Sequence, residues 1–133
     1  MIKAKEASAL WIKCNPNPLG KQTGDCVVRA LAIALEQSWK RTYRELCELG
    51  EIEAELPNTN NVWGLYLKQH GAEQFLLPES CPSCINVRAF CDRYPDGVYV
   101  VGTGSHAVAC ISGDYLDSWD SGLEPLSYFW RVR

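Results

Sequence analysis

The chain has 133 residues, of which 47% are hydrophobic and 22% are charged, and its formal net charge is −3. This length and composition predict one globular domain, residues 1–133, with a core of its own. The basic residues do not cluster, which excludes the usual footprint of a nucleic-acid partner. No run approaches the roughly 18–20 apolar residues that cross a membrane, so no membrane association is expected.

The N-terminus and the cysteines bear on the cellular compartment. Residues 1–6 lead into no apolar segment of the kind found in signal peptides, so we expect a cytoplasmic protein. The seven cysteines are an odd number, which favours free thiols over a disulfide framework.

The first part of the chain predicts a short strand, a loop and a helix. Residues 9–13 form the candidate strand, and the prolines and asparagines of 15–20 predict a loop. A helix is expected over 25–36, and it is apolar on nearly every side. A helix of that kind belongs at the centre of a domain.

One charged residue, Arg29, stands in the middle of this apolar helix. A buried guanidinium needs a buried partner, because an unpaired charge in a core is costly. A carboxylate, from Asp25 or Asp117, is the expected partner, and we expect the pair to be structural.

Two more helices are expected in the first half. The second covers 38–49 and ends at Gly50, because glycine favours helix C-termini. Its predicted apolar stripe consists of Trp39, Tyr43, Leu46 and Cys47. The third helix starts after the asparagine-rich segment 58–61 and stops at Gly71.

Strands dominate the rest of the chain. Residues 72–77 are a candidate strand, and Asn86 caps a predicted helix that continues to Tyr94. Four further strands are predicted at 98–101, 106–111, 115–119 and 126–132. Helices first and strands last predict an α+β domain, with a central helix packed on a C-terminal antiparallel sheet.

The residues that are best suited to catalyse a reaction are a cysteine, a histidine and two aspartates. Cys26 falls in the first turn of the central helix, where unpaired N–H groups and the helix dipole stabilise a thiolate. His106 opens a later strand, and Asp117 and Asp120 lie on or near the next strand. A nucleophile, a base and an acid that orients the base make up a thiol hydrolase. Taken singly, each also has an ordinary structural role, since free cysteine is among the most buried residue types.

The turn between the last two of these strands decides which aspartate meets His106. A turn centred on Gly113 places Asp120 directly opposite His106, with the two side chains about 5 Å apart. In that register Asp117 lies some three positions along the sheet, roughly 10 Å away. The register therefore predicts Asp120, whereas a bulged hairpin would favour Asp117.

Three segments carry a resemblance to a known family: 15–31 with its run GDCVVRAL, 105–109 (SHAVA) and 115–120 (YLDSWD). They resemble small papain-like cysteine peptidases of bacteriophages and bacteria, over about residues 15–130. The resemblance implies a papain-like fold, with Cys26 as nucleophile, His106 as general base and Asp120 or Asp117 as the orienting acid. The run from Asp117 to Trp119 is similar to the Asn-Ser-Trp of papain itself, which favours Asp117.

The same family likeness raises the question of the oxyanion donors. The backbone N–H of Cys26 can supply one donor. Papain-like enzymes usually take another from a glutamine that stands further before the cysteine than Gln22 does here. The candidates are therefore Gln22, Asn17 and Asn15. The pair Asp25-Cys26 also resembles cell-wall amidases of the NlpC/P60 kind.

These residues lead to one main functional hypothesis and two alternatives. The main one is a hydrolase that cleaves a peptide, isopeptide or related amide bond of a protein or peptide substrate, through an acyl-enzyme on Cys26 and without a cofactor. A papain-like fold used only as a phage or bacterial binding or inhibitory module is the second.

A structural zinc module is the third reading. It depends on the single pair Cys81-x-x-Cys84, whereas zinc needs about four ligands. Cys91 and His70 could complete such a site, but their spacing gives no support, so we expect no metal.

Overall fold

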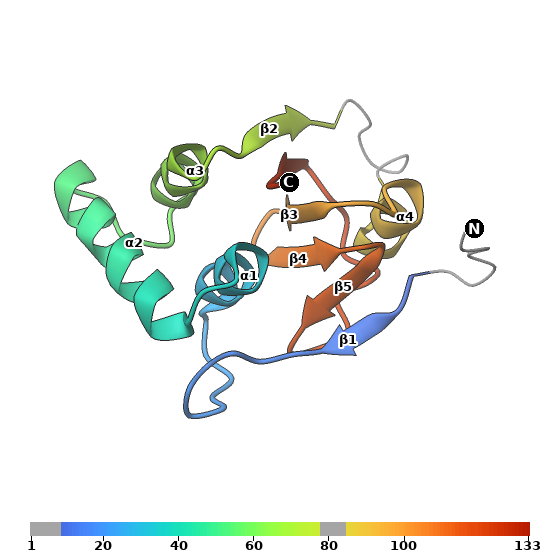
Figure 1. Ribbon diagram of the computed structural model, residues 1–133, viewed down its shortest axis with the longest axis horizontal. Coiled ribbons are helices and arrows are strands. Elements are labelled where there is room, and N and C mark those ends of the chain that lie inside the picture. Colours follow the sequence, from blue (N-terminus) through green and yellow to red (C-terminus); the bar gives the residue numbers. More distant parts are fainter. Residues whose placement is uncertain (1–8, 78–84) are drawn as a thin grey trace.

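The computed structural model describes residues 9–77 and 85–133, which form an α+β fold (Figure 1). Four helices are present in these ranges: α1 (Cys26–Leu35), α2 (Trp39–Glu53), α3 (Asn60–Gln69) and α4 (Val87–Arg93). Six strands accompany them: β1 (Trp11–Lys13), β2 (Glu73–Leu76), β3 (Val98–Gly102), β4 (Ala107–Ile111), β5 (Asp114–Asp117) and β6 (Tyr128–Arg131). The predicted α+β class is confirmed, and most element bounds agree with the prediction to within a few residues.

All six strands belong to one sheet in the order β1-β5-β4-β3-β6-β2. Neighbouring strands are antiparallel except β1 and β5, which are parallel. The prediction of an antiparallel sheet is therefore wrong for β1. The reason is topological: β1 is separated from β5 by all four helices, and a long connection of that kind can bring two strands together in parallel.

The sheet separates two hydrophobic clusters, as the alternation along β3 shows. Val98 and Val100 pack in the cluster formed with α1, α2 and α3. Tyr99 and Val101 pack in the other cluster, with Phe90 of α4. Because successive side chains of a strand point to opposite faces, β3 contributes to both. Figure 1 shows α1 between the α2–α3 pair and the strands β3, β4 and β5.

Helix α1 is the central helix, as its composition predicts. Seven of its ten residues are buried: Val27, Val28, Arg29, Ala30, Leu31, Ala32 and Ala34. It packs on β4, β3 and β5, and against α2 on its other side. Burying one valine or leucine side chain contributes about 1.5–3 kcal/mol to the stability of the fold. The helix therefore fixes the position of Cys26, its first residue, relative to the sheet.

Helix α2 differs from its prediction at Gly50, which lies inside the helix. A Cβ atom at Gly50 would come 2.7 Å from the Glu55 carbonyl oxygen, so the chain needs a glycine here for close approach. The helix ends instead at Ala54, in the left-handed conformation with φ 56°. The predicted apolar stripe is also only partly buried: Leu46 is 0% exposed, whereas Tyr43 is 47% exposed.

The β4–β5 hairpin has a tighter turn than predicted. Ile111 pairs with Asp114, so Ser112 and Gly113 alone form the turn. Both have positive φ, 51° and 83°, which is the conformation of a two-residue hairpin turn of type I′. The register is therefore shifted by one residue from a turn centred on Gly113.

Membrane-spanning segments were also sought. Within residues 9–77 and 85–133, no helix is long and apolar enough to cross a bilayer.

Candidate active site

Cys26 is the first residue of α1, and its surroundings keep the helix N-terminus open. The preceding residue, Asp25, makes no side-chain cap to the helix. Its carboxylate instead binds Arg29, accepts from the Trp39 indole N–H at 2.8 Å and accepts from the Asn17 amide at 3.1 Å. The N–H groups of the first helical turn are consequently left beside the Cys26 thiol, where they favour a thiolate.

His106 stands immediately before β4, in the tight connection from β3. The Thr103 N–H donates to the His106 carbonyl at 2.8 Å, which closes this turn. The His106 ring is half-buried and hydrogen-bonds the Cys26 side chain, and the Ala107 backbone also hydrogen-bonds the Cys26 sulfur. The start of β4 therefore docks directly on the start of α1.

Asp117, at the end of β5, holds the other side of the ring. His106 Nε2 lies 2.7 Å from Asp117 Oδ2, so Nδ1 is the nitrogen left for the sulfur. Asp117 is 3% exposed and accepts from three more groups: the Ser121 hydroxyl at 2.6 Å, the Ser118 N–H at 2.7 Å and Arg29 Nη2 at 3.3 Å. A buried carboxylate with four donors is well satisfied as an anion.

The electrostatics favour a charged cysteine–histidine pair. Burial raises the pKa of the Cys26 thiol. This effect is outweighed by hydrogen bonds from His106 and the Ala107 backbone and by the positive charges of His106 and Arg29, so the pKa of Cys26 is lowered. Burial lowers the pKa of His106, but the hydrogen bonds and charges of Asp117 and Cys26 raise it to about 9.

Asp117 is charged as well. Burial raises the pKa of its carboxyl, but hydrogen bonds from His106 and Ser121 outweigh it and the pKa is lowered. The three shifts all favour the same charges, a thiolate on Cys26, an imidazolium on His106 and a carboxylate on Asp117.

Asp120 does not meet His106, and the hairpin register that placed the two side chains opposite each other is wrong. Asp120 lies beyond the end of β5, where it accepts from the Tyr115 hydroxyl at 2.5 Å and the Gly122 N–H at 3.1 Å. Its other oxygen is 3.6 Å from Arg88. The two-residue turn explains the error, because the shifted register brings Asp117 one position closer to His106 along the sheet.

Arg29 joins Asp25, which precedes Cys26, to Asp117, which contacts His106. Its guanidinium pairs with Asp25 through one nitrogen and with Asp117 through the other. All three side chains are at most 6% exposed, so this is a buried ionic cluster. Sequence reasoning left Asp25 and Asp117 open as partners, and the structure has both.

The three oxyanion candidates have different surroundings. The Asn15 side chain bonds the Lys21 carbonyl and the Asn17 N–H, so it orders the loop before α1. Asn17 does the same, accepting from Leu19 and Lys21 and donating to Asp25. Neither lines the hollow at Cys26.

Gln22 is placed differently. Its Oε1 accepts from the Ser118 hydroxyl at 3.2 Å, next to Asp117 in the chain. That bond orients the amide and leaves Nε2 as the end that can donate. Gln22 does not line the hollow at Cys26 either, but its bond to Ser118 holds it beside the Asp117 segment, a link that neither asparagine has among the described residues.

A hollow of about 250 Å³, the Cys26 cleft, opens beside the cysteine and His106. Its other lining residues come from the segments around Cys26 and His106 and from two further segments of the chain: Gly24, Val27, Asn58, Asn60, Trp63, Thr103, Gly104, Ser105, Ala107 and Tyr128. Trp63 is buried and its ring lies 6.0 Å from that of Tyr128. Trp119 also contacts the histidine, with its ring 4.9 Å from the His106 ring.

Sequence reasoning missed Tyr128, which lines the Cys26 cleft. Burial raises the pKa of Tyr128, and the charge of Cys26 raises it further. One signal was present: a Cβ atom at Gly102 would lie 2.4 Å from the Tyr128 ring, so that glycine is needed for the ring to reach the cleft.

Of the remaining cysteines in the described residues, Cys91 and Cys110 contact each other in the buried cluster with Phe90, and His70 does not belong to that cluster. Cys14, Cys47, Cys91 and Cys110 are free thiols, and so is Cys26. His70 Nδ1 instead lies 2.9 Å from the Tyr66 carbonyl oxygen. The pair Cys81 and Cys84 lies outside the described residues. Within residues 9–77 and 85–133, no group of three or more His, Cys, Asp or Glu residues could hold a metal ion.

No protein-family model matches the chain, and neither a curated protein nor a solved structure matches it.

The buried cluster predicts a large effect of removing its cation. Arg29→Met leaves Asp25 and Asp117 buried without their counter-charge, so we expect the free energy of unfolding to fall by about 3–5 kcal/mol. The matched control is Arg41→Met, because Arg41 makes an exposed pair with Glu45; the expected loss there is about 0–1 kcal/mol. Urea denaturation of both variants measures the difference, and equal effects would contradict the structural role of Arg29.

The lowered pKa of Cys26 predicts selective alkylation. A lowered thiol pKa means that, at a given pH, more of Cys26 is thiolate than of an ordinary cysteine, and that this thiolate is lost as the pH falls through the lowered pKa. Iodoacetamide at pH 7 should therefore label Cys26 at least about tenfold faster than Cys14, whose pKa is raised by burial and by Asp117. His106→Ala should shift the pH–rate curve of Cys26 to higher pH. Peptide mapping across a pH series decides, and faster labelling of another cysteine would refute the prediction.

Proposed function

We propose that this protein is a papain-like thiol hydrolase that cleaves an amide bond of a protein or peptide substrate. The observation that carries the proposal is the hydrogen-bonded chain of Cys26, His106 and Asp117 at the edge of a cleft. A structural cysteine has no need of a charged histidine partner or of a carboxylate behind it. An activated nucleophile needs both.

Cys26 acts first, as the nucleophile. Its thiolate attacks the carbonyl carbon of the substrate, a sulfur–carbon bond forms, and the carbonyl electron pair moves to oxygen. The resulting oxyanion accepts from the Cys26 backbone N–H, which has no partner within the helix, and from Gln22 Nε2. Charged donors are not needed, because fixed dipoles in a half-buried site stabilise an oxyanion effectively.

His106 then transfers protons in both half-reactions. As the carbon–nitrogen bond breaks, the imidazolium gives its proton to the leaving amine, and a thioester remains on Cys26. Neutral His106 next takes a proton from water, whose oxygen attacks the thioester carbon. The sulfur–carbon bond breaks, the acid product leaves, and the thiolate–imidazolium pair is restored.

Asp117 contributes by orientation and charge. Its bond to Nε2 turns Nδ1 toward the sulfur, and its negative charge stabilises the imidazolium. Ser121 and Arg29 hold the carboxylate in place from two other directions.

The proposal is tested by measuring turnover of fluorogenic peptide libraries, isopeptide-linked peptides and cell-wall stem peptides. The stem peptides test for an amidase of the NlpC/P60 kind. Cys26→Ala should abolish turnover, and Asp117→Asn should lower kcat/KM by about 10²–10⁴-fold, because general acid–base catalysis depends on the oriented ring. Asp120→Asn is the matched control and should change kcat/KM by less than about threefold.

Two results would overturn this assignment. If Asp120→Asn is the more damaging change, the acid has been misassigned. If the panel gives neither turnover nor a thioester on Cys26, while Cys26→Ala keeps its biological effect, the protein is a binding module rather than a hydrolase.

The oxyanion assignment has its own test. Gln22→Ala should lower kcat by about 10²–10³-fold with little change in KM, because the donor acts on charge that exists only in the transition state. Asn15→Ala, a loop residue outside the cleft, is the control for disturbance of the segment before α1. An effect on KM alone would show that Gln22 binds substrate rather than the oxyanion.

A further inference from the structure

We infer that the exposed face of α2 binds a second copy of this chain, with the two α2 helices antiparallel across a two-fold axis near Cys47. In this arrangement Arg44 of each copy faces Glu48 of the other. The inference is independent of the proposed hydrolase function, because it uses α2 and not the Cys26 cleft. Three observations carry it: a groove between two rows of side chains, exposed apolar groups beside that groove, and a separation of charge along the helix.

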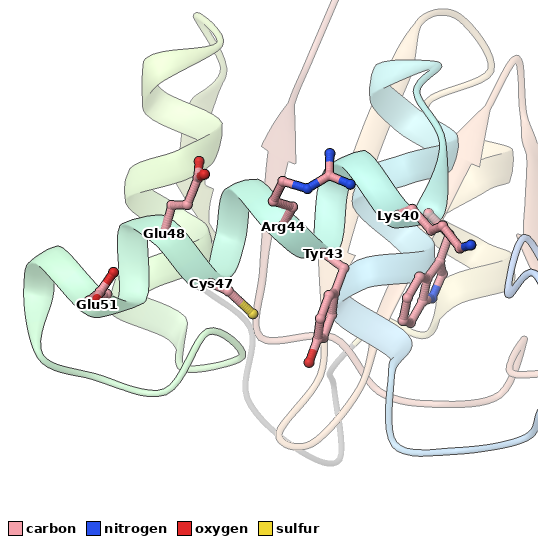
Figure 2. Close-up of a pocket in the computed structure, with 7 residues that line it drawn as sticks. Lys40, Tyr43, Arg44, Cys47, Glu48 and Glu51 are labelled. Atoms are coloured by element: carbon pink, nitrogen blue, oxygen red, sulfur yellow. The ribbon is translucent and has the colours of Figure 1, made fainter.

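The groove is a hollow of about 690 Å³ that runs along α2. Figure 2 shows Tyr43 and Cys47 projecting from one side of the helix, and Arg44 and Glu48 projecting from another. All residues that line the hollow belong to α2, and they form two rows in which each residue is four positions from the next. Rows of this spacing are the ridges and grooves through which helices most often pack on each other. The first row is Trp39, Tyr43, Cys47 and Glu51, and the second row is Lys40, Arg44 and Glu48.

Apolar side chains beside the groove are left in solvent. Tyr43 is 47% exposed, although its ring stacks on that of Trp39 with the centroids 5.0 Å apart. Ile52 continues the second row by four positions and is 76% exposed. Cys47, between them along the helix, is a half-buried free thiol. A second helix lying in the groove would remove apolar surface of this kind from water.

The charges of this face are separated along α2, with the basic residues first. Lys40 and Arg44 precede Cys47, whereas Glu48 and Glu51 follow it (Figure 2). The helix has no acidic residue in its first turn and no basic residue in its last turn. The helix dipole favours the opposite order, and a basic residue four positions before an acidic one is the weaker orientation of a helical pair. A single copy of α2 therefore does not satisfy these charges well.

The four charged groups of the face also lack partners of their own. None of them forms an ion pair with another residue of the described ranges 9–77 and 85–133. Arg41 and Glu45 of the same helix differ, because they pair with each other at 3.1 Å. Turning α2 end over end exchanges the basic half of the face with the acidic half. An antiparallel second copy is therefore complementary in charge, whereas a parallel copy would set like charges together.

The positions of the charges also locate the two-fold axis. The midpoint of Arg44 and Glu48 and the midpoint of Lys40 and Glu51 both fall within two residues of Cys47. Helices that pack through rows four residues apart cross at about 50°, so their contacts concentrate at the crossing point. The Arg44–Glu48 pairs lie closest to that point, and the Lys40–Glu51 pairs lie farther out. The two Cys47 side chains face each other near the axis.

The size of the face predicts a weak dimer. One helix face is small beside the roughly 1,600 Å² that a standard stable interface buries, so association should require a high protein concentration. The types of residue nevertheless suit an interface, because tryptophan, tyrosine and arginine are enriched where proteins meet. Trp39, Tyr43 and Arg44 supply all three.

The test is sedimentation velocity of the full chain under reducing conditions, at about 0.1 M salt, where the Debye length of about 10 Å leaves contacting charges largely unscreened. Over about 5–500 µM protein, the wild type should shift from monomer toward dimer. Arg44→Glu and Glu48→Arg should each raise the dimer dissociation constant at least about tenfold, because each sets like charges together at two symmetric contacts.

Mixing the two variants provides the decisive measurement. An equimolar mixture of Arg44→Glu and Glu48→Arg should dimerise about as well as the wild type. In the mixed dimer, the acid introduced at position 44 of one chain faces the base introduced at position 48 of the other, and the two unsubstituted residues also face each other. Such a rescue requires contact between chains and shows at the same time that both variants are folded.

Two further measurements serve as a control and a map of the interface. Lys68→Glu changes the net charge as Arg44→Glu does, but at an exposed position of α3, and should change the dissociation constant by less than about twofold. A short bismaleimide should join Cys47 of one copy to Cys47 of the other in the wild type, and much less so in Arg44→Glu. Peptide mapping by mass spectrometry identifies the linked cysteines.

Each contrary result overturns the inference. A wild type that remains monomeric over the whole concentration range shows that α2 does not bind a second copy. A dimer that both charge substitutions leave as strong as in the wild type has its interface elsewhere. If both variants weaken the dimer and their mixture does not restore it, the antiparallel arrangement is wrong.

Discussion

The arrangement of this molecule depends on one buried cation. Arg29 stands in the middle of the central helix and pairs with Asp25 at the start of that helix and with Asp117 at the end of β5, 88 positions away in the chain. A buried guanidinium is destabilising without such partners, so the helix can pack on the sheet only where both carboxylates reach it. The same two contacts place Cys26, next to Asp25, against His106, next to Asp117 in space. The contacts that allow α1 to pack on the sheet are thus the same contacts that place Cys26 against His106.

That cluster also sets the charges of the site and connects it to the surface. Arg29 lowers the pKa of Cys26 through its positive charge, and Asp117 raises the pKa of His106 through its negative charge. A proton therefore favours the ring over the sulfur, although burial opposes the charged form of both. On its outer side, Asp25 accepts from the Trp39 indole, so α2 is attached to the same network. The carboxylate next to Cys26 therefore joins α2 as well as Arg29 to the start of α1.

The sequence predicted the elements of this site better than their pairing. The apolar run of α1 and the strand that follows His106 were readable because burial imposes a strong local pattern. The hairpin register, and with it the aspartate expected beside His106, was mispredicted because the β4–β5 turn uses Ser112 at positive φ, which is uncommon outside glycine and is not specified by local sequence. Gly50 was read as a helix end for a similar reason: its role is close approach to Glu55, a tertiary contact that propensity does not report.

The walls of the cleft could not be predicted at all, since they come from segments far apart in the chain, and their meeting depends on the packing of α1. The finished site nevertheless has a simple division. Helix α1 supplies the proposed nucleophile, Cys26, as its first residue. The sheet side supplies the proposed base, His106, directly before β4, and the proposed orienting acid, Asp117, in β5. Because α1 packs on β4 and β5 and Arg29 joins the helix to Asp117, a substitution that shifts the helix on the sheet would also separate Cys26 from His106.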